Sequence, residues 1–380
     1  MARPRTAIRR LALQNFRNYE AHSLDLDGRH VVLAGANGAG KTNLLEAVSV
    51  IAPGRGLRSA EFASLGRDAG DGPSKAWGLS IVLQQGEDER RISLQSHLTP
   101  AGRIGRAARI DGEEATSTAV GEVLRVIWLT PAMDRVFAGG KTDRRRFFDR
   151  LVLAHAPNHG RQATAYEKAL RERLAVLETG GDPAWLDALE ARLSDAGAAL
   201  TFARAHALVA LRRAFDVRPE DAFPKADLDL AGEVEQAALD GADLGALKAT
   251  LTEGFARARQ TDARAGRSLY GPHRFDVETR HRPKNMPAAQ CSTGEQKALL
   301  IGLVLANAQS LAGGVDTPDP ILLLDEAAAH LDPERRSGLY DALSALPGQA
   351  WLTGTDAALF DAFGDRAQRF DVSGGRATPA

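Results

Sequence analysis

One short stretch of the chain has the residue types and the order needed to hold a row of phosphates. It matches G-x-x-x-x-G-K-[ST] at every fixed position, through Gly35, Ala36, Asn37, Gly38, Ala39, Gly40, Lys41 and Thr42. Glycines let the backbone curl so that successive N–H groups point at phosphates, and a following helix start adds partial positive charge. Lys41 would reach the β- and γ-phosphates, and Thr42 would offer its hydroxyl to Mg²⁺. Since an apolar run precedes the loop and an amphipathic segment follows it, we predict a site for ATP and Mg²⁺.

A second candidate lies far along the chain, where an apolar run ends in two acids. Residues 321–324 are Ile-Leu-Leu-Leu, and Asp325 and Glu326 follow them. A central parallel strand is buried on both faces, so it is apolar throughout. Asp325 at its carboxyl end would bind Mg²⁺, and Glu326 would act as general base toward an attacking water. The pattern is weak alone and gains weight beside a phosphate loop.

A third motif precedes the acidic strand. Ser292 and Glu295 form an S-x-x-E capping box before an apolar helix, which is a common and purely structural device. With Gly294, the segment also has the form Ser-x-Gly-Glu/Gln-Gln-Lys/Arg, which resembles the signature motif of ABC-type ATPases. The resemblance implies that Ser292 and Gly294 contact the γ-phosphate of a nucleotide bound by another subunit. The later stretch His330-Leu331-Asp332 resembles the D-loop of that class, which implies that Asp332 lies near a dimer seam.

The single copy of each motif has a consequence for assembly. In ABC ATPases, the signature of one subunit closes on the ATP held by the phosphate loop of the other. We therefore expect an ATP-driven homodimer with an isologous two-fold interface and two sandwiched ATP molecules.

Composition excludes several classes of protein. The chain has 380 residues, 44% of them hydrophobic, which is enough for one large elaborated domain or for two domains. Apolar runs are of strand length, so we expect no membrane span, and no apolar segment follows the first arginines to form a secretory signal. The one cysteine, Cys291, excludes internal disulfides and a Cys-based zinc site. We expect a cytoplasmic protein without a membrane partner.

Basic residues gather locally although the net charge is −1. Clusters occur at 103–109, at 144–146 and between 257 and 284. Such patches can bind a phosphate backbone even in a neutral chain. Arginine is common throughout this sequence, so an ordinary solvated surface is an equally good interpretation of each cluster.

The elements that position the motifs are predicted at both ends of the chain. Strands are expected at 8–13, 22–25, 31–34, 79–84, 91–95, 126–129, 275–279, 321–324 and 350–353. Helices are expected after Thr42, through most of 144–215, at 243–265 and from Ser292. The predicted fold class is α/β, a P-loop ABC-type ATPase head interrupted by a helical, coiled-coil-like insertion.

Three domains follow from this pattern. Residues 1–140 would form the part of the head with the phosphate loop, 141–266 the helical insertion, and 267–380 the part with the signature and the acidic strand. Within 183–215, apolar residues recur at alternating steps of three and four, as in a heptad seam: Leu186, Leu189, Leu193, Ala196, Leu200, Ala203, Ala207 and Ala210. Because half of the seam is alanine, a projecting coiled coil and a compact helical subdomain stay equal alternatives.

Three local stretches narrow the class. Residues 11–19 resemble the opening pattern of the RecF family, which ends in N-F-R-N-Y. Residues 54–59 resemble the family's Gly-(Lys/Arg)-S-x-R region, and residues 270–274 resemble its G-P-H-R motif. With the short insertion, the chain is identified as a member of this family of SMC/Rad50-like ABC ATPases, and the resemblance covers the whole chain. It departs from the family pattern at Phe275, at Glu295, in 129–134, and in the lack of the usual ABC switch histidine at 353–356.

The resemblance implies a slow, DNA-dependent ATPase of recombination repair. ATP would close a homodimer that binds gapped DNA or single-/double-strand junctions, and hydrolysis would release it. The implied partners are RecR and RecO, which help to load RecA. Arg58 would approach the γ-phosphate or couple it to DNA, and His273 and Arg274 would support the site or the DNA face.

Two other classes of function remain to be weighed. A transporter ATPase subunit would need a membrane partner, and the helical insertion argues against it. A non-catalytic adaptor could use the fold for dimerisation alone, and the intact Lys41, Asp325 and Glu326 argue against that.

Overall fold

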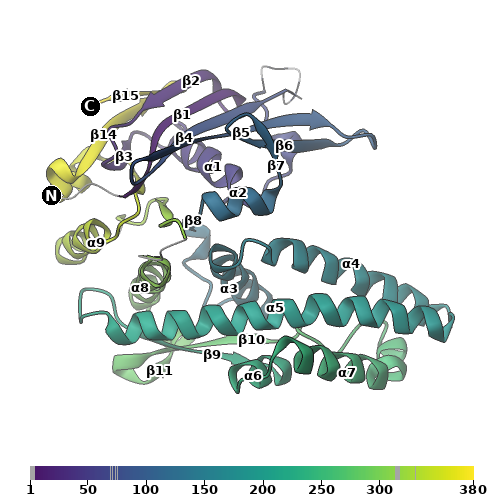
Figure 1. Ribbon diagram of the computed structural model, residues 1–380. Coiled ribbons are helices and arrows are strands. Elements are labelled where there is room, and N and C mark those ends of the chain that lie inside the picture. The colour runs from purple at the N-terminus through teal and green to yellow at the C-terminus, as the bar shows by residue number, and fades with distance from the viewer. Residues whose placement is uncertain are drawn as a thin grey trace. The chain divides into compact units, whose positions relative to one another are not determined.

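The computed structural model describes residues 5–68, 70, 72, 74, 76–312, 317–329 and 331–380. The chain divides into two compact units (Figure 1). Unit 1 consists of Met1–Asp134, Pro219–Pro224 and Lys297–Ala380, and unit 2 of Arg135–Arg218 and Lys225–Gln296. The predicted α/β class is confirmed.

Unit 1 contains two six-stranded sheets. The first is antiparallel, in the order β2 (Tyr19–Asp25), β1 (Thr6–Phe16), β4 (Gly78–Gln85), β5 (Asp88–Leu98), β6 (Ile104–Ile110) and β7 (Glu113–Ala115). The second has the order β15 (Arg376–Pro379), β14 (Ala367–Ser373), β3 (His30–Ala34), β13 (Ala350–Gly354), β12 (Ile321–Leu324) and β8 (Val126–Leu129). Its strands are parallel except for β15.

The second sheet brings the phosphate loop and the two acids to the same end of its strands. Strands β3, β13, β12 and β8 are buried along their whole length, as expected for strands covered on both faces. The order β3–β13–β12 and the parallel pairing bring the carboxyl ends of β3 and β12 to the same side, separated by β13 alone. Ligands of open α/β sheets bind outside the carboxyl ends of the strands.

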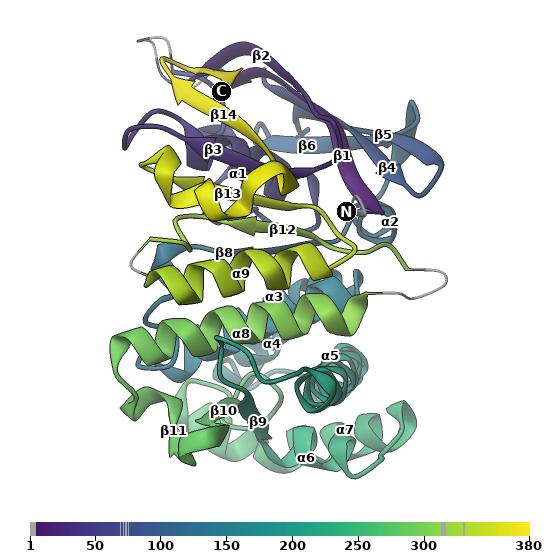
Figure 2. The ribbon, with the colours of Figure 1, turned by 90° about the vertical axis from the view of Figure 1, so that its left-hand side faces the viewer.

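The helices of unit 1 flank these sheets. They are α1 (Lys41–Ile51), α2 (Ser117–Val123), α8 (Thr293–Leu311) and α9 (Pro333–Ala345), with 3-10 turns at Phe62–Ser64, Pro131–Met133 and Ala357–Arg366. Helix α1 contacts β1, β4 and β5 of the first sheet and β13 of the second, so it is buried between the sheets. Figure 2 shows α8 and α9 side by side below β12 and β8. Among the described residues, no helix is both long and apolar enough to span a membrane.

Unit 2 combines helices with a small sheet. Its helices are α3 (Lys141–His155), α4 (His159–Glu178), α5 (Pro183–Val217), α6 (Glu233–Leu239) and α7 (Leu244–Ala265). Strands β9 (Ala226–Ala231), β10 (Asp276–His281) and β11 (Met286–Pro287) form an antiparallel sheet, with 3-10 turns at Arg282–Lys284 and Ala288–Gln290. Within this unit, α5 lies between α4 on one side and β9 and α6 on the other (Figure 1).

The predicted heptad segment forms one continuous helix of 35 residues, α5. The first five seam residues are buried, but the buried side then shifts toward Leu208 and Leu211. This is the drift expected of a straight helix with 3.6 residues per turn against a seven-residue repeat. Because α5 packs against α4, α6, α7 and β9, the compact alternative is the one observed.

The second unit differs from the insertion predicted at 141–266. It contains three strands and continues to Gln296, because β10 pairs with β9 along its whole length. The division between the units therefore falls inside α8, four residues after its start at Thr293. Every predicted strand overlaps an observed strand, whereas β6, β7, β9, β11, β14 and β15 were not predicted.

Candidate nucleotide-binding site

The loop between β3 and α1 has the backbone that a phosphate loop needs. Gly35 has φ 153°, and a Cβ there would come within 2.3 Å of the Val372 carbonyl oxygen. Gly40 precedes the helix in the left-handed region with φ 113°, and a Cβ there would meet the Asn18 amide and the Tyr19 hydroxyl. Both positions need glycine, since other residues rarely adopt this conformation and would clash.

Lys41 is held over this loop. Its Nζ donates to the carbonyl oxygens of Gly35 at 2.6 Å and Ala36 at 2.8 Å. Burial lowers the pKa of the Lys41 ammonium, and the nearby carboxylates of Glu326 and Asp325 oppose that shift. The side chain thus lies within the loop, between its carbonyls and the acids at the end of β12.

Asp325 and Thr42 meet as the sequence predicts. The Thr42 hydroxyl donates to Asp325 Oδ1 at 2.9 Å and lies 3.2 Å from Oδ2. Asp325 is buried, and its backbone N–H donates to the Leu129 carbonyl of β8 at 2.9 Å. A hydroxyl beside a carboxylate is the set of hard oxygen donors that suits Mg²⁺.

Thr353 of β13 joins the two acids and was not predicted as a site residue. Its hydroxyl donates to Asp325 Oδ1 at 2.8 Å and accepts from the Glu326 backbone N–H at 2.9 Å. Glu326 itself has φ 51°, a left-handed conformation that costs a non-glycine residue on the order of 1–3 kcal/mol. Thr353 therefore fixes the backbone that directs the Glu326 carboxylate. A polar residue at the end of an otherwise apolar strand was the available signal.

The turn between β1 and β2 braces the loop and was also missed. Asn18 donates to the Ala39 carbonyl at 3.4 Å and accepts from the Asn43 amide at 2.7 Å. The Tyr19 hydroxyl donates to the Gly40 carbonyl at 3.2 Å. The N-F-R-N-Y stretch thus acts locally, by attaching a hairpin to the phosphate loop.

Two arginines converge on one buried acid of α1. Arg17 forms a bidentate pair with Glu46, with Nε 2.9 Å from Oε2 and Nη2 2.5 Å from Oε1. Arg58 donates to the same carboxylate at 2.9 Å and to Asn43 at 2.6 Å. Glu46 is fully buried, whereas the Arg58 side chain is 43% exposed. The Arg58 side chain therefore packs against α1, the helix that follows the phosphate loop, and its role toward phosphate or DNA stays a prediction.

The signature segment belongs to unit 2. The predicted capping box is formed, since Ser292 N donates to Glu295 Oε2 at 2.9 Å and Glu295 N approaches the Ser292 hydroxyl at 3.4 Å. Ser292 and Gly294 are exposed, and a Cβ on Gly294 would meet nothing within 4 Å. Both groups are open to a ligand at the start of α8.

Asp332 caps the start of α9. Its Oδ1 accepts from the Arg335 backbone N–H at 2.8 Å. In unit 1, the Lys297 ammonium donates to the Ala329 carbonyl at 3.0 Å and lies 3.8 Å from Asp134. His330 lies outside the described residues. The position of Asp332 at a dimer seam stays a prediction.

The G-P-H-R segment lies in unit 2, where His273 is largely buried. Its ring nitrogens contact the Tyr166 hydroxyl at 2.7 Å and the Ser268 carbonyl at 3.1 Å, and burial lowers its pKa. Arg274 is exposed. Phe275 is buried under the guanidinium of Arg204, 4.1 Å from the ring centroid, so this departure from the family pattern serves packing.

Some arginines of the basic clusters make hydrogen bonds and ion pairs within the fold. Arg106 donates to the Val50 and Ala52 carbonyls at the end of α1, and Arg144 forms a bidentate pair with Asp276 at 2.9 and 2.8 Å. Other members of these clusters are exposed: Arg103, Arg109, Arg146, Arg257, Arg264, Arg267, Arg274, Arg280 and Lys284.

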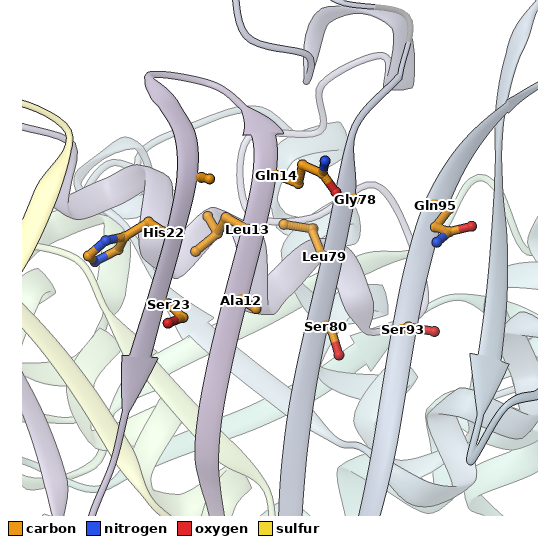
Figure 3. A pocket seen from close by; sticks show the side chains of 11 residues that line it. Ala12, Leu13, Gln14, His22, Ser23, Gly78, Leu79, Ser80, Ser93 and Gln95 are labelled. Atoms are coloured by element: carbon orange, nitrogen blue, oxygen red, sulfur yellow. The ribbon is translucent and has the colours of Figure 1, made fainter.

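A separate hollow of about 460 Å³ lies on the antiparallel sheet of unit 1. Among the described residues, its lining has no acidic side chain, arginine or lysine, and none of the predicted phosphate-binding residues. Figure 3 shows Gln14, Ser80, Ser93 and Gln95 along β1, β4 and β5. The described lining therefore lacks the cationic side chains of a phosphate site.

The loop, the acids and the hydroxyls are chemically suited to a nucleotide with its cation. Backbone N–H groups of residues 35–42 and the start of α1 would face the phosphates, and Lys41 would neutralise them. Thr42 and Asp325 would hold Mg²⁺. The bound cation would withdraw charge from the phosphates.

A phosphate loop whose threonine is hydrogen-bonded to the acid at the end of β12, two strands away in the sheet, together with a Ser-x-Gly helix start, defines a P-loop ATPase of the ABC class. The chain matches the family model described as RecF/RecN/SMC N terminal domain over residues 7–360. It belongs to the RecF family. The DNA replication and repair protein RecF of Caulobacter vibrioides is 48% identical over 368 residues, 95% of each chain. The protein of that name from Rhizobium leguminosarum bv. trifolii is 46% identical over 377 residues, 98% of each chain.

Solved structures agree on the fold. A structure described as the recombination mediator protein RecF-ATP in the RecFOR pathway superposes with a TM-score of 0.82 at 19% identity, covering 100% of this chain and 99% of the other. The Smc head domain of Pyrococcus furiosus bound to the C-terminal domain of ScpA gives 0.54 at 17% identity, covering 99% and 96%. The predicted fold, an ABC-type ATPase head of the SMC kind, is confirmed.

Proposed function

We propose that this chain is an ATP-driven DNA-binding protein of recombination repair, in which ATP closes a homodimer on gapped or junction DNA. The proposal rests mainly on one observation: beside the phosphate loop, the hydroxyls of Thr42 and Thr353 both donate hydrogen bonds to Asp325. Membership of a family whose relatives are named DNA replication and repair protein supports the biological setting.

The residues have separate roles in this proposal. Residues 35–42 bind the phosphates, with Lys41 as the cation. Asp325 orients the Thr42 hydroxyl toward Mg²⁺. Glu326, held by its strained backbone, takes a proton from the attacking water.

The second half of each composite site would come from the partner subunit. Ser292 and Gly294 would meet the γ-phosphate through a hydroxyl and a helix N-terminus, and Asp332 would lie at the seam. Hydrolysis would remove the shared ligand and open the dimer. The ATPase is expected to be slow and stimulated by DNA.

Family membership is also the support for the proposed macromolecular partners. We propose double-stranded DNA and single-/double-strand junctions as ligands, and RecR and RecO as protein partners in the loading of RecA. Because DNA contacts would be made mainly to phosphates, affinity should fall steeply with salt.

The test measures self-association and DNA binding with ATP, with ADP and without nucleotide. Wild-type protein is compared with Lys41→Met, Ser292→Arg and, as a control, Lys248→Met on the exposed face of α7. ATP should drive dimerisation and DNA binding together, and the first two variants should lose both. Binding of ATP by a protein that stays monomeric and ignores DNA would refute the proposal and favour a different partner.

A further inference from the structure

Glu295, the acidic residue of the signature segment, forms an ion pair with Lys284. Glu295 uses Oε2 to accept from the Ser292 backbone N–H at 2.9 Å and from the Ser292 hydroxyl at 3.0 Å. Its other oxygen, Oε1, accepts from the Lys284 ammonium. The two oxygens thus have different tasks, one in the helix cap and one in an ion pair.

The chain around Lys284 is built as a fixed turn. Lys284 ends the 3-10 turn between β10 and β11, and its backbone N–H donates to His281 Nδ1 at 3.3 Å. The next residue, Asn285, has φ 45°, and Arg280 donates to its carbonyl at 2.6 Å and to its side chain at 3.0 Å. This bonding holds the turn that presents Lys284 to the start of α8.

Glu295 places negative charge where the proposed function requires a phosphate to arrive. Its carboxylate contacts the hydroxyl of Ser292 and lies one residue from Gly294. A γ-phosphate approaching this helix start would meet a like charge. Like charges at such range repel appreciably near a protein surface, and the repulsion is weakened by salt.

We propose that Lys284 is a positioning residue of the signature surface, which neutralises Glu295 so that Ser292 and Gly294 can receive the γ-phosphate of the partner subunit's nucleotide. The inference rests on the proposed function and deepens it. The Lys284 hydrogen bond, with those from Ser292, lowers the pKa of Glu295 to about 2. The carboxylate is ionised at neutral pH, as an ordinary glutamate would be, and the Lys284 ammonium offsets its charge.

A purely structural role makes a different prediction. The pair is partly exposed, with side-chain exposures of 51% for Lys284 and 25% for Glu295. Pairs of this kind usually contribute little to stability. A structural pair would therefore change unfolding slightly and leave ATP-driven dimerisation unchanged.

The experiment measures the dimer dissociation constant by sedimentation with saturating ATP and Mg²⁺, at low and at high salt. Lys284→Met should weaken the dimer about tenfold at low salt and less at high salt. Lys284→Arg should behave as wild type. Glu295→Gln keeps a capping-box residue without the charge, so the double variant Lys284→Met/Glu295→Gln should recover most of the loss.

The control is Lys248→Met, which breaks a partly exposed pair with Asp195 elsewhere on unit 2. Thermal unfolding of every variant shows whether folding is intact. If wild-type protein dimerises and Lys284→Met does so equally well, or if Glu295→Gln fails to rescue it, this inference alone is overturned. If wild-type protein stays monomeric with ATP, the proposed function fails and the inference fails with it.

Discussion

At the scale of single residues, the site depends on short hydrogen bonds between groups far apart in the sequence. Thr42, Asp325 and Thr353 come from the loop–helix junction and from two separate strands, yet their oxygens lie 2.8–2.9 Å apart in pairs. Each hydroxyl uses its one proton on the same carboxylate oxygen, Oδ1 of Asp325. Removal of either hydroxyl should therefore disturb Asp325 directly.

Thr353→Val removes the hydroxyl with little change of shape. The partly buried Glu326 N–H loses its acceptor, which costs about 1 kcal/mol, and Asp325 loses one donor. We expect ATP turnover to fall by about ten- to a hundredfold at saturating ATP, with a smaller change in ATP affinity. Thr353→Ser, which keeps the hydroxyl, is the control. Equal turnover in the valine variant and wild type would exclude this role.

Glu326→Gln should separate binding from hydrolysis. The amide cannot take a proton, so turnover should drop by about a hundredfold or more, whereas ATP binding should persist. The ATP-bound dimer should then accumulate, as a sedimentation experiment would detect. Glu334→Gln, on the exposed first turn of α9, should leave turnover unchanged. Undiminished turnover in Glu326→Gln would assign the base to another residue.

At the scale of elements, the stability of unit 2 depends on α5. Leu193 is fully buried in a cluster with Tyr166 of α4 and with Leu247 and Leu251 of α7. Five elements of the unit, α3, α4, α6, α7 and β9, pack against this one helix, so a void in α5 loosens contacts on two sides.

Leu193→Ala should lower the free energy of unfolding by about 2–5 kcal/mol, since it leaves a cavity in a packed core. Trp185→Ala, near the start of the same helix, removes a side chain that is 61% exposed and should have a small effect. Chemical denaturation followed by circular dichroism measures both. A loss below about 1 kcal/mol for Leu193→Ala would mean that the core of unit 2 can collapse around the gap.

Some of these elements could be predicted from the sequence, and others could not. Residues 321–324 and 31–34 are continuous apolar runs beside motifs, so their strands could be predicted. Strand β9, Ala-Asp-Leu-Asp-Leu-Ala, has strict alternation and was missed because it lies between two helical segments of the predicted insertion. The pairing of Lys284 with Glu295 has no signal at all in the sequence, because it depends on the path of a turn. Thr353 had a weak signal, as a polar residue at the end of an apolar strand, but its role depends on the position of β13 between β3 and β12.

At the scale of the whole molecule, one buried histidine links stability to pH. His30 of β3 is stacked on Phe363 at 5.3 Å, and its Nδ1 accepts from the Ala350 N–H at 3.0 Å. Burial, with a contribution from Arg366, lowers its pKa to about 4. The folded protein therefore keeps this ring neutral under mildly acid conditions.

The sign of the effect follows from linkage. The unfolded chain takes up a proton on His30 near pH 6.5, while the folded chain does so only near pH 4. This contribution to stability is present above about pH 6.5 and is lost as the pH falls to about 4, by on the order of 3 kcal/mol. In His30→Gln, whose amide oxygen can still accept from Ala350, stability should decline less between these pH values. Denaturation at pH 8, 6 and 4 measures it, and parallel curves for both proteins would refute it.

The strands that pair with β3 affect how the chain folds during its synthesis. The strand that leads into the phosphate loop pairs with β13 and β14, which are formed by residues 350–354 and 367–373. During synthesis, a ribosome would release the whole of unit 2 before either neighbour of β3 exists. We expect the nascent chain to carry an intact phosphate-loop sequence with no sheet to hold it, and with two unpaired strand edges. A chain truncated near residue 340 should therefore fail to bind nucleotide and should depend on chaperones, although all of its recognised motifs have been translated.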